Sequence, residues 1–149
     1  MITKTQVVVI GSGPGGYTAA FRAADLGKEV TLIERYESLG GVCLNVGCIP
    51  SKALLHTAQI INEAEEASHL GVTFSKPTID IDGIRNNKEA VVGKLTNGIK
   101  ALAKARKVNV VTGYGKFISN TQIAIDGGDE IIEFEQCIIA AGSRVTKIP

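Results

Sequence analysis

The chain has 149 residues, of which 44% are hydrophobic and 21% charged, and its 16 basic and 15 acidic side chains give a formal net charge of +1. This length and balance are typical of one globular domain spanning residues 1–149. An even charge with no basic block excludes nucleic acid and an anionic membrane as predicted partners. The longest apolar run near the start, residues 7–10, is too short for a signal peptide or a membrane span, so we expect a cytoplasmic protein.

The first part of the chain is predicted to alternate strand, helix and strand. Residues 5–10 are a β-branched run bounded by glycine, which is typical of a buried strand in a parallel sheet. Residues 17–26 form an alanine-rich helix that Gly27 ends, and residues 29–34 form a second strand. Together they predict a right-handed βαβ unit of about 30 residues.

Two helices and several short strands are predicted after this unit. Residues 51–70 have the period of an amphipathic helix that stops at Gly71. A second helix is expected from Asp80 or Asp82 to Lys107, although its three internal glycines weaken the pattern.

The last third of the chain is predicted to be mostly strand. Residues 108–111 and 137–140 are apolar runs typical of buried strands, and the turn at Gly127 and Gly128 lies within a predicted three-stranded antiparallel meander over residues 116–119, 122–126 and 130–135. The predicted fold class is therefore α/β, a Rossmann-like parallel sheet with a βαβ unit and an added meander.

A glycine motif follows the first predicted strand. Gly11, Gly13 and Gly16 in the pattern G-x-G-x-x-G supply a tight turn, close backbone approach to a pyrophosphate, and close packing of helix on strand. Glu34 ends the next predicted strand, where a carboxylate can accept hydrogen bonds from ribose hydroxyls. This context favours a dinucleotide site over a glycine-rich turn without a ligand, and it leaves NAD and FAD as alternatives.

Cys43 and Cys48 suggest a disulfide with a chemical use. In a straight helix, residues five apart have Cα atoms about 8 to 9 Å from each other, whereas a disulfide tolerates roughly 4.4 to 6.8 Å. The segment must therefore bend if the sulfurs pair, and Gly47 and Pro50 both relax helical regularity.

The cysteine pair has three possible interpretations. Structural core thiols explain poorly why two cysteines lie in a glycine-rich segment beside a nucleotide motif. Zinc usually takes C-x2-C spacing with two more ligands, which His56 and Cys137 are not arranged to supply, so no metal site is predicted. A redox pair beside a flavin explains both the spacing and the location, because a helix N-terminus favours the thiolate that such chemistry needs.

Four other side chains, which lie near this pair or after it in the chain, are of types that could take part in its chemistry. Lys52 lies about one helical turn after Cys48, so its charge could stabilise a thiolate or a reduced flavin, although a solvated lysine is the ordinary alternative. His56 and His69 are interpreted as partly exposed helix residues, and Cys137 as a small core residue.

Four segments carry a resemblance to a known family. They are GSGPGG at residues 11–16, Glu34, GGVCLNVGCIPSKALLH at residues 40–56 and IIAAGS at residues 138–143. Together they resemble the dihydrolipoamide dehydrogenases, which are pyridine nucleotide-disulfide oxidoreductases. The resemblance covers the chain from end to end, and the cysteine motif is its most specific part. Leu44, Ile49 and residues 51–55 favour the lipoamide branch over the glutathione and mercuric reductases.

The resemblance implies an FAD bound in an extended form. Its pyrophosphate is expected at residues 11–16, its adenosine ribose at Glu34, and its flavin ring against Cys48 and Lys52. The full set of cofactor contacts implied is Gly11, Gly13, Pro14, Gly15, Gly16, Glu34, Arg35, Gly40, Gly41, Val42, Cys43, Cys48, Lys52, Gly115, Ala141, Gly142 and Ser143.

The resemblance also implies a reaction and its partners. Cys43 is expected to be the thiol that exchanges with dihydrolipoamide, Cys48 the thiol that passes electrons to flavin, and NAD the final acceptor. The expected partners are lipoyl groups of 2-oxoacid dehydrogenase complexes and, for the parent enzyme, a second copy in a homodimer. Two alternatives are a glutathione or mercuric reductase-like flavoprotein and a non-catalytic flavin-binding or docking module.

One departure from the family is expected to matter. The sequence stops at Pro149, near the end of the first flavin-domain segment of family members. The rest of the flavin domain, the NAD domain, and the dimerisation domain with its catalytic His-Glu pair have no counterpart in these residues. We therefore expect the 149-residue chain by itself to lack full turnover.

Overall fold

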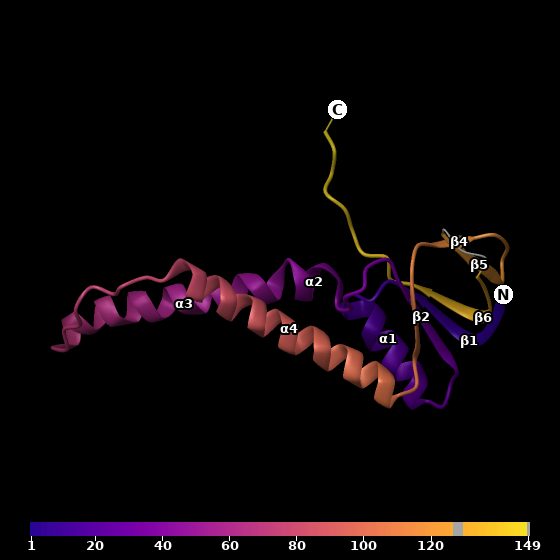
Figure 1. Ribbon diagram of the computed structural model, residues 1–149, viewed down its shortest axis with the longest axis horizontal. Coiled ribbons are helices and arrows are strands. Elements are labelled where there is room, and N and C mark those ends of the chain that lie inside the picture. The colour runs from indigo at the N-terminus through magenta and orange to yellow at the C-terminus, as the bar shows by residue number, and fades with distance from the viewer. Residues whose placement is uncertain (127–129, 149) are drawn as a thin grey trace. The chain divides into compact units, whose positions relative to one another are not determined.

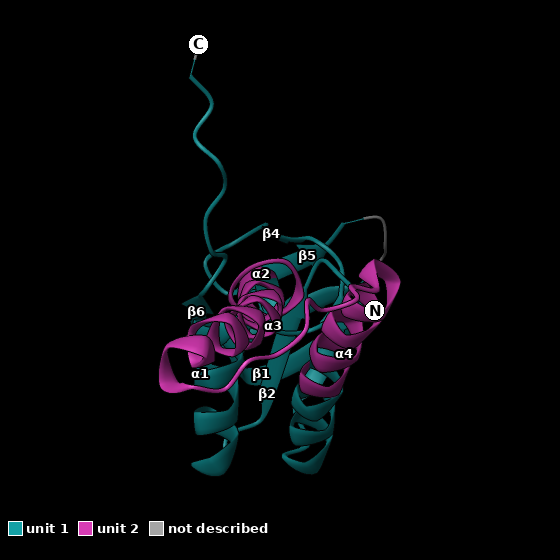
Figure 2. Cartoon of the chain, turned by 90° about the vertical axis from the view of Figure 1, so that its left-hand side faces the viewer, with its two compact units in different colours: residues 1–41, 96–149 teal, residues 42–95 magenta. Residues whose placement is uncertain are grey.

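The computed structural model describes residues 1–126 and 130–148 (Figure 1). Its chain divides into two compact units: a first unit of residues 1–41 and 96–149, and a second unit of residues 42–95 (Figure 2). In chain order the elements are β1 (Ile2–Ile10), α1 (Pro14–Asp25), β2 (Val30–Glu34), α2 (Gly41–Asn45), α3 (Cys48–Glu66), the 3-10 helix η1 (Ala67–Leu70), α4 (Ile81–Ala105), β3 (Asn109–Thr112), β4 (Gly115–Phe117), β5 (Gln122–Ile125) and β6 (Ile131–Ile139).

The first unit contains a mixed sheet in the order β3-β2-β1-β6-β5-β4. The neighbours β3, β2, β1 and β6 run parallel, whereas β5 runs antiparallel to both β6 and β4. The predicted α/β class, the βαβ unit of β1, α1 and β2, and the meander are therefore confirmed. The predicted turn of the meander at Gly127 and Gly128 lies outside the described residues.

Alternation along the central strands divides the core into two layers. On one face Val9 and Leu32, both fully buried, pack in one cluster with Phe21 of α1 and Ala103 of α4. On the other face Val8 packs in a second cluster with side chains of β5 and β6. Because both faces of this part of the strand are covered, residues 7–10 of β1 form a continuous apolar run rather than an alternating pattern.

The prediction of two separate strands over residues 130–135 and 137–140 was wrong. They form one strand, β6, which pairs with β1 along nearly its whole length, from Ile2 opposite Ile131 to Ile10 opposite Ile139. Only the first part of β6 also pairs with β5. The sequence pattern changes along the strand because its neighbours change, not because the strand ends. This pairing also extends β1 back to Ile2, earlier than the predicted start at Thr5.

The prediction of a buried strand at residues 108–111 was also wrong about burial. The strand that forms there, β3, begins and ends one residue later than predicted. β3 lies at the edge of the sheet and pairs only with β2. Only Val111 of its four residues is buried, and Val110 is exposed. An apolar run at a sheet edge has one side without a neighbouring strand, so hydrophobicity alone does not distinguish it from a central strand.

The second unit contains α2, α3, η1 and the first part of α4. Its long helix α3 begins at Cys48, three residues before the predicted start, and continues into η1, which ends at the left-handed Gly71. Although the helix is amphipathic in sequence, none of its residues, all of which are described, is buried within this structure. His56 and His69 are both exposed, as the sequence indicated.

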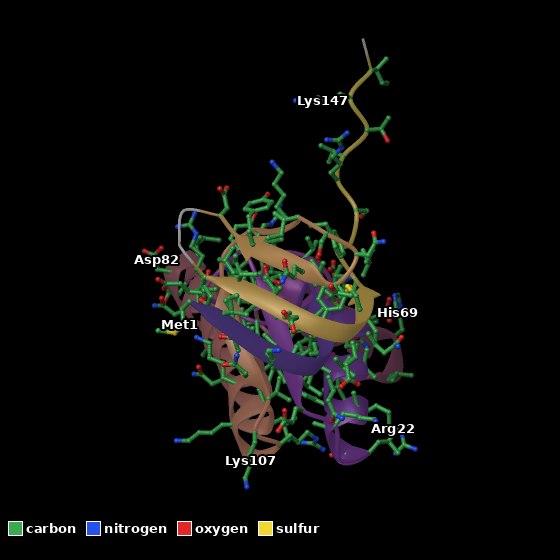
Figure 3. The ribbon with its side chains drawn as sticks, turned by 90° about the vertical axis from the view of Figure 1, so that its right-hand side faces the viewer. Met1, Arg22, His69, Asp82, Lys107 and Lys147 are labelled. Carbon is green, nitrogen blue, oxygen red and sulfur yellow. The ribbon has the colours of Figure 1, made fainter. Side chains whose placement is uncertain are left out.

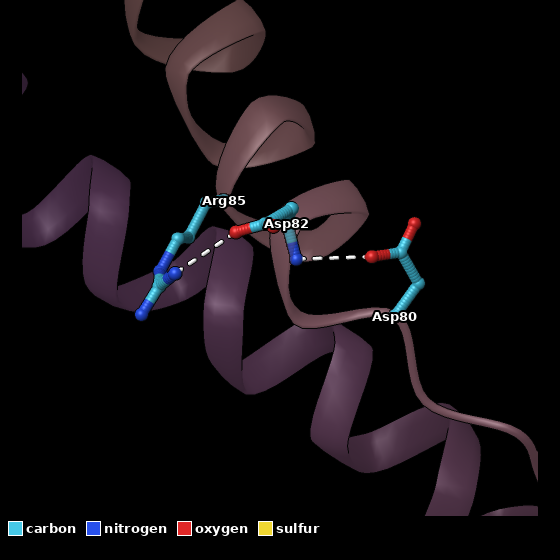
Figure 4. A network of polar contacts seen from close by, with 3 residues as sticks. All are labelled: Asp80, Asp82 and Arg85. Carbon is cyan, nitrogen blue, oxygen red and sulfur yellow. Dashed lines mark hydrogen bonds and ion pairs between the residues drawn. The ribbon is translucent and has the colours of Figure 1, made fainter.

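The start of α4 is stabilised by acidic side chains. The Asp82 amide donates to Asp80 Oδ1 at 3.0 Å, and Arg85 pairs with Asp82 at 2.9 Å (Figure 4). Asp80 therefore occupies the N-cap position of α4. Of the two helix starts predicted from the sequence, Asp80 and Asp82, the structure supports Asp80. At the other end, the Lys107 side chain extends away from the ribbon (Figure 3), and its backbone adopts a positive φ of 56°.

Replacing Gly98 in α4 with alanine is expected to stabilise the protein. An added Cβ at Gly98 meets no atom within 4 Å, so alanine gains helix propensity of about 1 kcal/mol without a steric cost. Thermal denaturation should show a raised Tm. Gly83→Ala in the same helix is the matched control, because its Cβ would lie 2.7 Å from Asp80 Oδ2 and should cancel the gain. A lower Tm for Gly98→Ala would contradict the prediction.

Candidate functional site

Two glycines of the predicted phosphate loop are required by packing. Gly11 adopts a φ of 94° and donates its amide to Ile33 O at 2.8 Å. A Cβ at Gly11 would lie 2.3 Å from Ala140 O, and one at Gly16 would lie 1.8 Å from Gly11 O. These positions therefore hold β1, the start of α1 and the end of β6 together at one end of the sheet.

The other two glycines of the loop border open space. A Cβ at Gly13 or Gly15 would meet nothing within 4 Å, and Pro14 is exposed at the first turn of α1. No side chain of the described residues caps this helix N-terminus. Free amides and the positive end of the helix dipole make such a terminus a binding site for an anion. The loop thus offers backbone where an anionic group can approach closely.

Glu34 is buried beside the loop. Its side chain Oε2 accepts hydrogen bonds from Ser12 N at 2.9 Å and from Ser12 Oγ at 2.6 Å, while Oε1 accepts from Tyr36 N at 3.1 Å. Glu34 is only 6% exposed and Ser12 is fully buried. The carboxylate at the end of β2 is therefore held against the phosphate loop, the position expected of a ribose-binding acid.

A glycine bend packs onto the same loop. The Gly40 amide donates to Ser12 O at 3.0 Å, and both Gly40 and Gly41 adopt positive φ values, 105° and 60°. A Cβ at Gly41 would lie 2.7 Å from Gly13 Cα. The bend can approach the loop this closely only because neither residue has a side chain.

Arg35 lies just after the acid and contacts two aromatic rings. Its guanidinium donates to the Tyr114 hydroxyl at 2.8 Å and lies 4.6 Å from the ring centroid of Tyr36. The bond to Tyr114 is the main reason that the pKa of Arg35 rises above its ordinary value. Gly115, the next residue, packs tightly, since its Cβ would lie 3.1 Å from Ile123 Cγ2 and 3.4 Å from Ile33 Cδ1.

The last predicted contacts follow β6. Ala140 donates its amide to Ile10 O at 2.8 Å, which places the start of the exposed segment Ala141, Gly142 and Ser143 next to the end of β1. Gly142 adopts a φ of 74°. The first unit therefore brings residues 11–16, Glu34, Arg35, Gly40, Gly41, Gly115 and Ala141 to the carboxyl ends of its parallel strands. Ligands of open α/β sheets usually bind at this edge.

The cysteine pair lies in the second unit with Val42 and Lys52. Cys43 is in α2 and Cys48 is the first residue of α3, and the chain leaves helical geometry between them at Gly47, with φ −119° and ψ −110°. The predicted bend is therefore present. Pro50 lies in the first turn of α3, where its missing amide has no helical partner to lose, so the bend comes from Gly47 rather than from Pro50.

Both cysteines are free thiols in this structure. The neighbouring Cys48 side chain is the main cause of a raised pKa at Cys43, and the positive charge of Lys52 acts in the opposite direction. Lys52 thus favours the Cys43 thiolate, but in the reduced pair Cys48 has the larger effect on the pKa of Cys43. Cys137 packs against the second core cluster, and its burial raises its pKa.

Removing the Cys48 thiol is expected to lower the pKa of Cys43. In reduced Cys48→Ala, alkylation of Cys43 by iodoacetamide should reach half its maximal rate at a lower pH than in the unchanged protein, because the thiolate is the reacting form. Lys52→Met should shift the same profile to higher pH, since the ammonium lowers the pKa. Lys76→Met, whose charge is not among the causes acting on Cys43, is the control. Peptide mass spectrometry gives the rates, and an unshifted Cys48→Ala profile would contradict this prediction.

Two negative observations concern residues 1–126 and 130–148. No group of three or more His, Cys, Asp or Glu side chains there is placed to hold a metal ion. Within the same ranges, no helix combines the length and hydrophobicity that crossing a membrane requires.

Comparison with known proteins identifies the family. The sequence model of the pyridine nucleotide-disulphide oxidoreductases matches residues 5–149. The chain belongs to this family. Among curated family members, it is 56% identical to a dihydrolipoyl dehydrogenase of Vibrio cholerae over 148 residues and 58% identical to one of Haemophilus influenzae over 149 residues. Each alignment covers 98% of this chain and 31% of the relative, so the chain spans about a third of their length.

A solved structure of a flavoprotein disulfide reductase has a similar fold. The HOCl-induced flavoprotein disulfide reductase RclA from Escherichia coli superposes with a TM-score of 0.78 at 29% identity, covering 97% of this chain and 29% of that one. The family resemblance drawn from the motifs is therefore confirmed along the chain. Two residues that contact the candidate site, Ser12 and Tyr114, were not singled out from sequence. Their positions in the sequence could have indicated them. Tyr114 directly precedes the predicted contact Gly115, and Ser12 is the hydroxyl residue between the motif glycines Gly11 and Gly13.

Proposed function

We propose that this chain binds FAD and carries the redox disulfide of a dihydrolipoamide:NAD oxidoreductase. The observation that carries the proposal is the cysteine pair: Cys43 in α2 and Cys48 at the start of α3 lie on either side of the Gly47 bend. They are close enough that Cys48 raises the pKa of Cys43, and Lys52 is close enough to lower it. This pair occurs in a chain that also has a phosphate loop and a ribose-type acid. The identity to dihydrolipoyl dehydrogenases, higher than that to the disulfide reductase structure, supports the lipoamide branch.

The residues of the first unit fit the adenosine diphosphate part of FAD. Gly13 and Gly15 leave open the space that a Cβ would fill, and the uncapped start of α1 suits a pyrophosphate. Glu34 retains acceptor capacity for a ribose hydroxyl, and Arg35, Gly115 and Ala141 lie near the same carboxyl ends of the parallel strands. When bound, FAD supplies a two-electron acceptor for a dithiol.

The cysteine pair would perform thiol–disulfide exchange. With Cys43 and Cys48 oxidised, a thiolate of dihydrolipoamide attacks Cys43 Sγ, the Cys43–Cys48 bond breaks, and the electron pair goes to Cys48. The second lipoyl thiolate then attacks the mixed disulfide and releases Cys43. Dihydrolipoamide has then lost two electrons and two protons and become the cyclic disulfide lipoamide, and the protein disulfide has become a dithiol. The Lys52 ammonium stabilises the thiolates formed.

The proposed partners follow from this chemistry. The lipoyl groups are those of 2-oxoacid dehydrogenase complexes, NAD is the final electron acceptor, and the whole enzyme is a homodimer. A glutathione or mercuric reductase-like activity uses the same pair with another substrate. A non-catalytic flavin-binding module would not need the pair at all.

Reconstitution with FAD tests the proposal directly. The purified chain should bind FAD at a ratio of one to one, measured by flavin fluorescence and by co-elution on gel filtration. After mild oxidation, dihydrolipoamide should restore the Cys43 and Cys48 thiols, whereas glutathione at equal thiol concentration should do so more slowly. A chain that binds no flavin overturns the FAD assignment. Equal rates with both thiols would remove the preference for lipoamide.

A further inference from the structure

The proposed function gives the side chain of Ser12 no role, yet this side chain joins three segments of the first unit. Its Oγ donates to Glu34 Oε2 at 2.6 Å and accepts from the Gly40 amide at 3.2 Å. Its backbone adds bonds to the same two residues, from Ser12 N to Glu34 Oε2 and from Gly40 N to Ser12 O. Ser12 therefore ties the phosphate loop, the acid that ends β2 and the glycine bend to one another.

The bonds to Glu34 account for most of its capacity as an acceptor. A carboxylate has about four lone-pair positions. Ser12 donates twice to Oε2, and the Tyr36 amide donates to Oε1. Oε2 is thereby committed to the loop, and the capacity that remains is on Oε1. With its two oxygens held by different segments, the carboxylate cannot rotate without breaking a buried hydrogen bond, which is costly.

From these contacts we propose that Ser12 is a positioning residue for ribose recognition. Its hydroxyl fixes the Glu34 carboxylate so that the open acceptor position on Oε1 stays available to one hydroxyl of an adenosine ribose. The Gly40 amide, donating to Ser12 Oγ, orients the hydroxyl proton towards Glu34. The inference rests on the proposed FAD site and adds to it a residue that does not itself touch the ligand.

Thr5 provides a matched comparison in the same region of the fold. It is also buried, at 7% exposure, and its Oγ1 donates to Glu29 O at 3.0 Å. It lies towards the opposite end of β1, away from the phosphate loop. If a buried hydroxyl mattered only for stability, its removal from Thr5 and from Ser12 would have the same kind of effect on the protein.

The experiment compares two nucleotides with the full chain. FAD binding is measured first, and then the dissociation constants of ADP and of 2′,3′-dideoxy-ADP are measured by calorimetry for the unchanged protein, Ser12→Ala and Thr5→Val. The unchanged protein should prefer ADP by about tenfold, since a hydrogen bond to a charged group is lost in the dideoxy compound. Ser12→Ala should bind both nucleotides with nearly equal affinity. Thr5→Val should retain the tenfold preference whatever its Tm.

Each outcome decides between the proposals. An unchanged preference in Ser12→Ala, with FAD still bound, overturns the role of Ser12 and leaves the proposed function in place. An unchanged protein that binds FAD but does not distinguish the two nucleotides also overturns it. Absence of FAD binding overturns both. If Ser12→Ala does not fold, Ser12→Gly, which keeps the backbone donor to Glu34 and lacks the hydroxyl, gives the same measurement.

Discussion

Replacing either Cys43 or Cys48 with serine is expected to abolish the response of the protein to dihydrolipoamide. In the oxidised unchanged protein, a count of free thiols in denaturant should find Cys137 alone, and dihydrolipoamide added before denaturation should raise the count to three. A disulfide needs both sulfurs, so each single variant has no internal bond to exchange. The thiol count before and after dihydrolipoamide is the measurement, and the expected loss is complete rather than partial.

Cys137→Ala is the matched control for this prediction. Cys137 is partly buried against the second core cluster, and its raised pKa disfavours the reactive thiolate. Its removal should leave the exchange intact and lower each count by one. Loss of exchange in Cys137→Ala, or failure of Cys43 and Cys48 to pair under mild oxidation, would show that the bend at Gly47 does not form a redox pair.

Alanine at different glycines of the phosphate loop is expected to separate folding from FAD binding. Gly16→Ala would place a Cβ 1.8 Å from Gly11 O, so backbone has to move and the free energy of unfolding should fall by about 3 kcal/mol. Gly13→Ala meets no atom within 4 Å, and its φ of −64° is one that alanine adopts freely, so stability should be unchanged. The same methyl group fills the space proposed for the pyrophosphate, so FAD affinity should fall at least tenfold.

Chemical denaturation and FAD titration of both variants measure these two effects. Thr18→Ala, an exposed substitution one turn into α1, is the control that should change neither quantity greatly. Normal FAD affinity in Gly13→Ala would show that the pyrophosphate does not approach this loop. Normal stability in Gly16→Ala would contradict the close packing of α1 against the end of β1.

Local pattern was sufficient for the elements that bury a continuous apolar surface. β1, α1 and β2 follow from a β-branched run, a glycine motif and an alanine-rich helix, and they form the predicted βαβ unit in the structure. The two long helices were also predicted, with shifted ends. The periodicity predicts a start at Ser51, whereas α3 begins at Cys48, because Pro50 fits the first turn of a helix without losing a hydrogen bond.

Predictions failed where the environment of a segment changes along its length. β6 was divided in two because its first part has β5 as a neighbour and its last part does not, and the sequence changes with that neighbour. β3 was expected in the interior, but it pairs on one side only. Neither property is local, since both depend on which strand lies alongside.

The sequence by itself determined the family, the dinucleotide motif and the spacing of the cysteine pair. These features depend only on residue type and on order along the chain, as for the motif glycines, the two cysteines and the acidic residue at the end of a strand. The tertiary structure alone decided how these groups are held. It showed that Gly47 supplies the bend, that the Cys48 thiol outweighs Lys52 in setting the pKa of Cys43, and that Ser12 contacts Glu34. Such effects fall off steeply with distance, and distances between groups far apart in the chain exist only after folding.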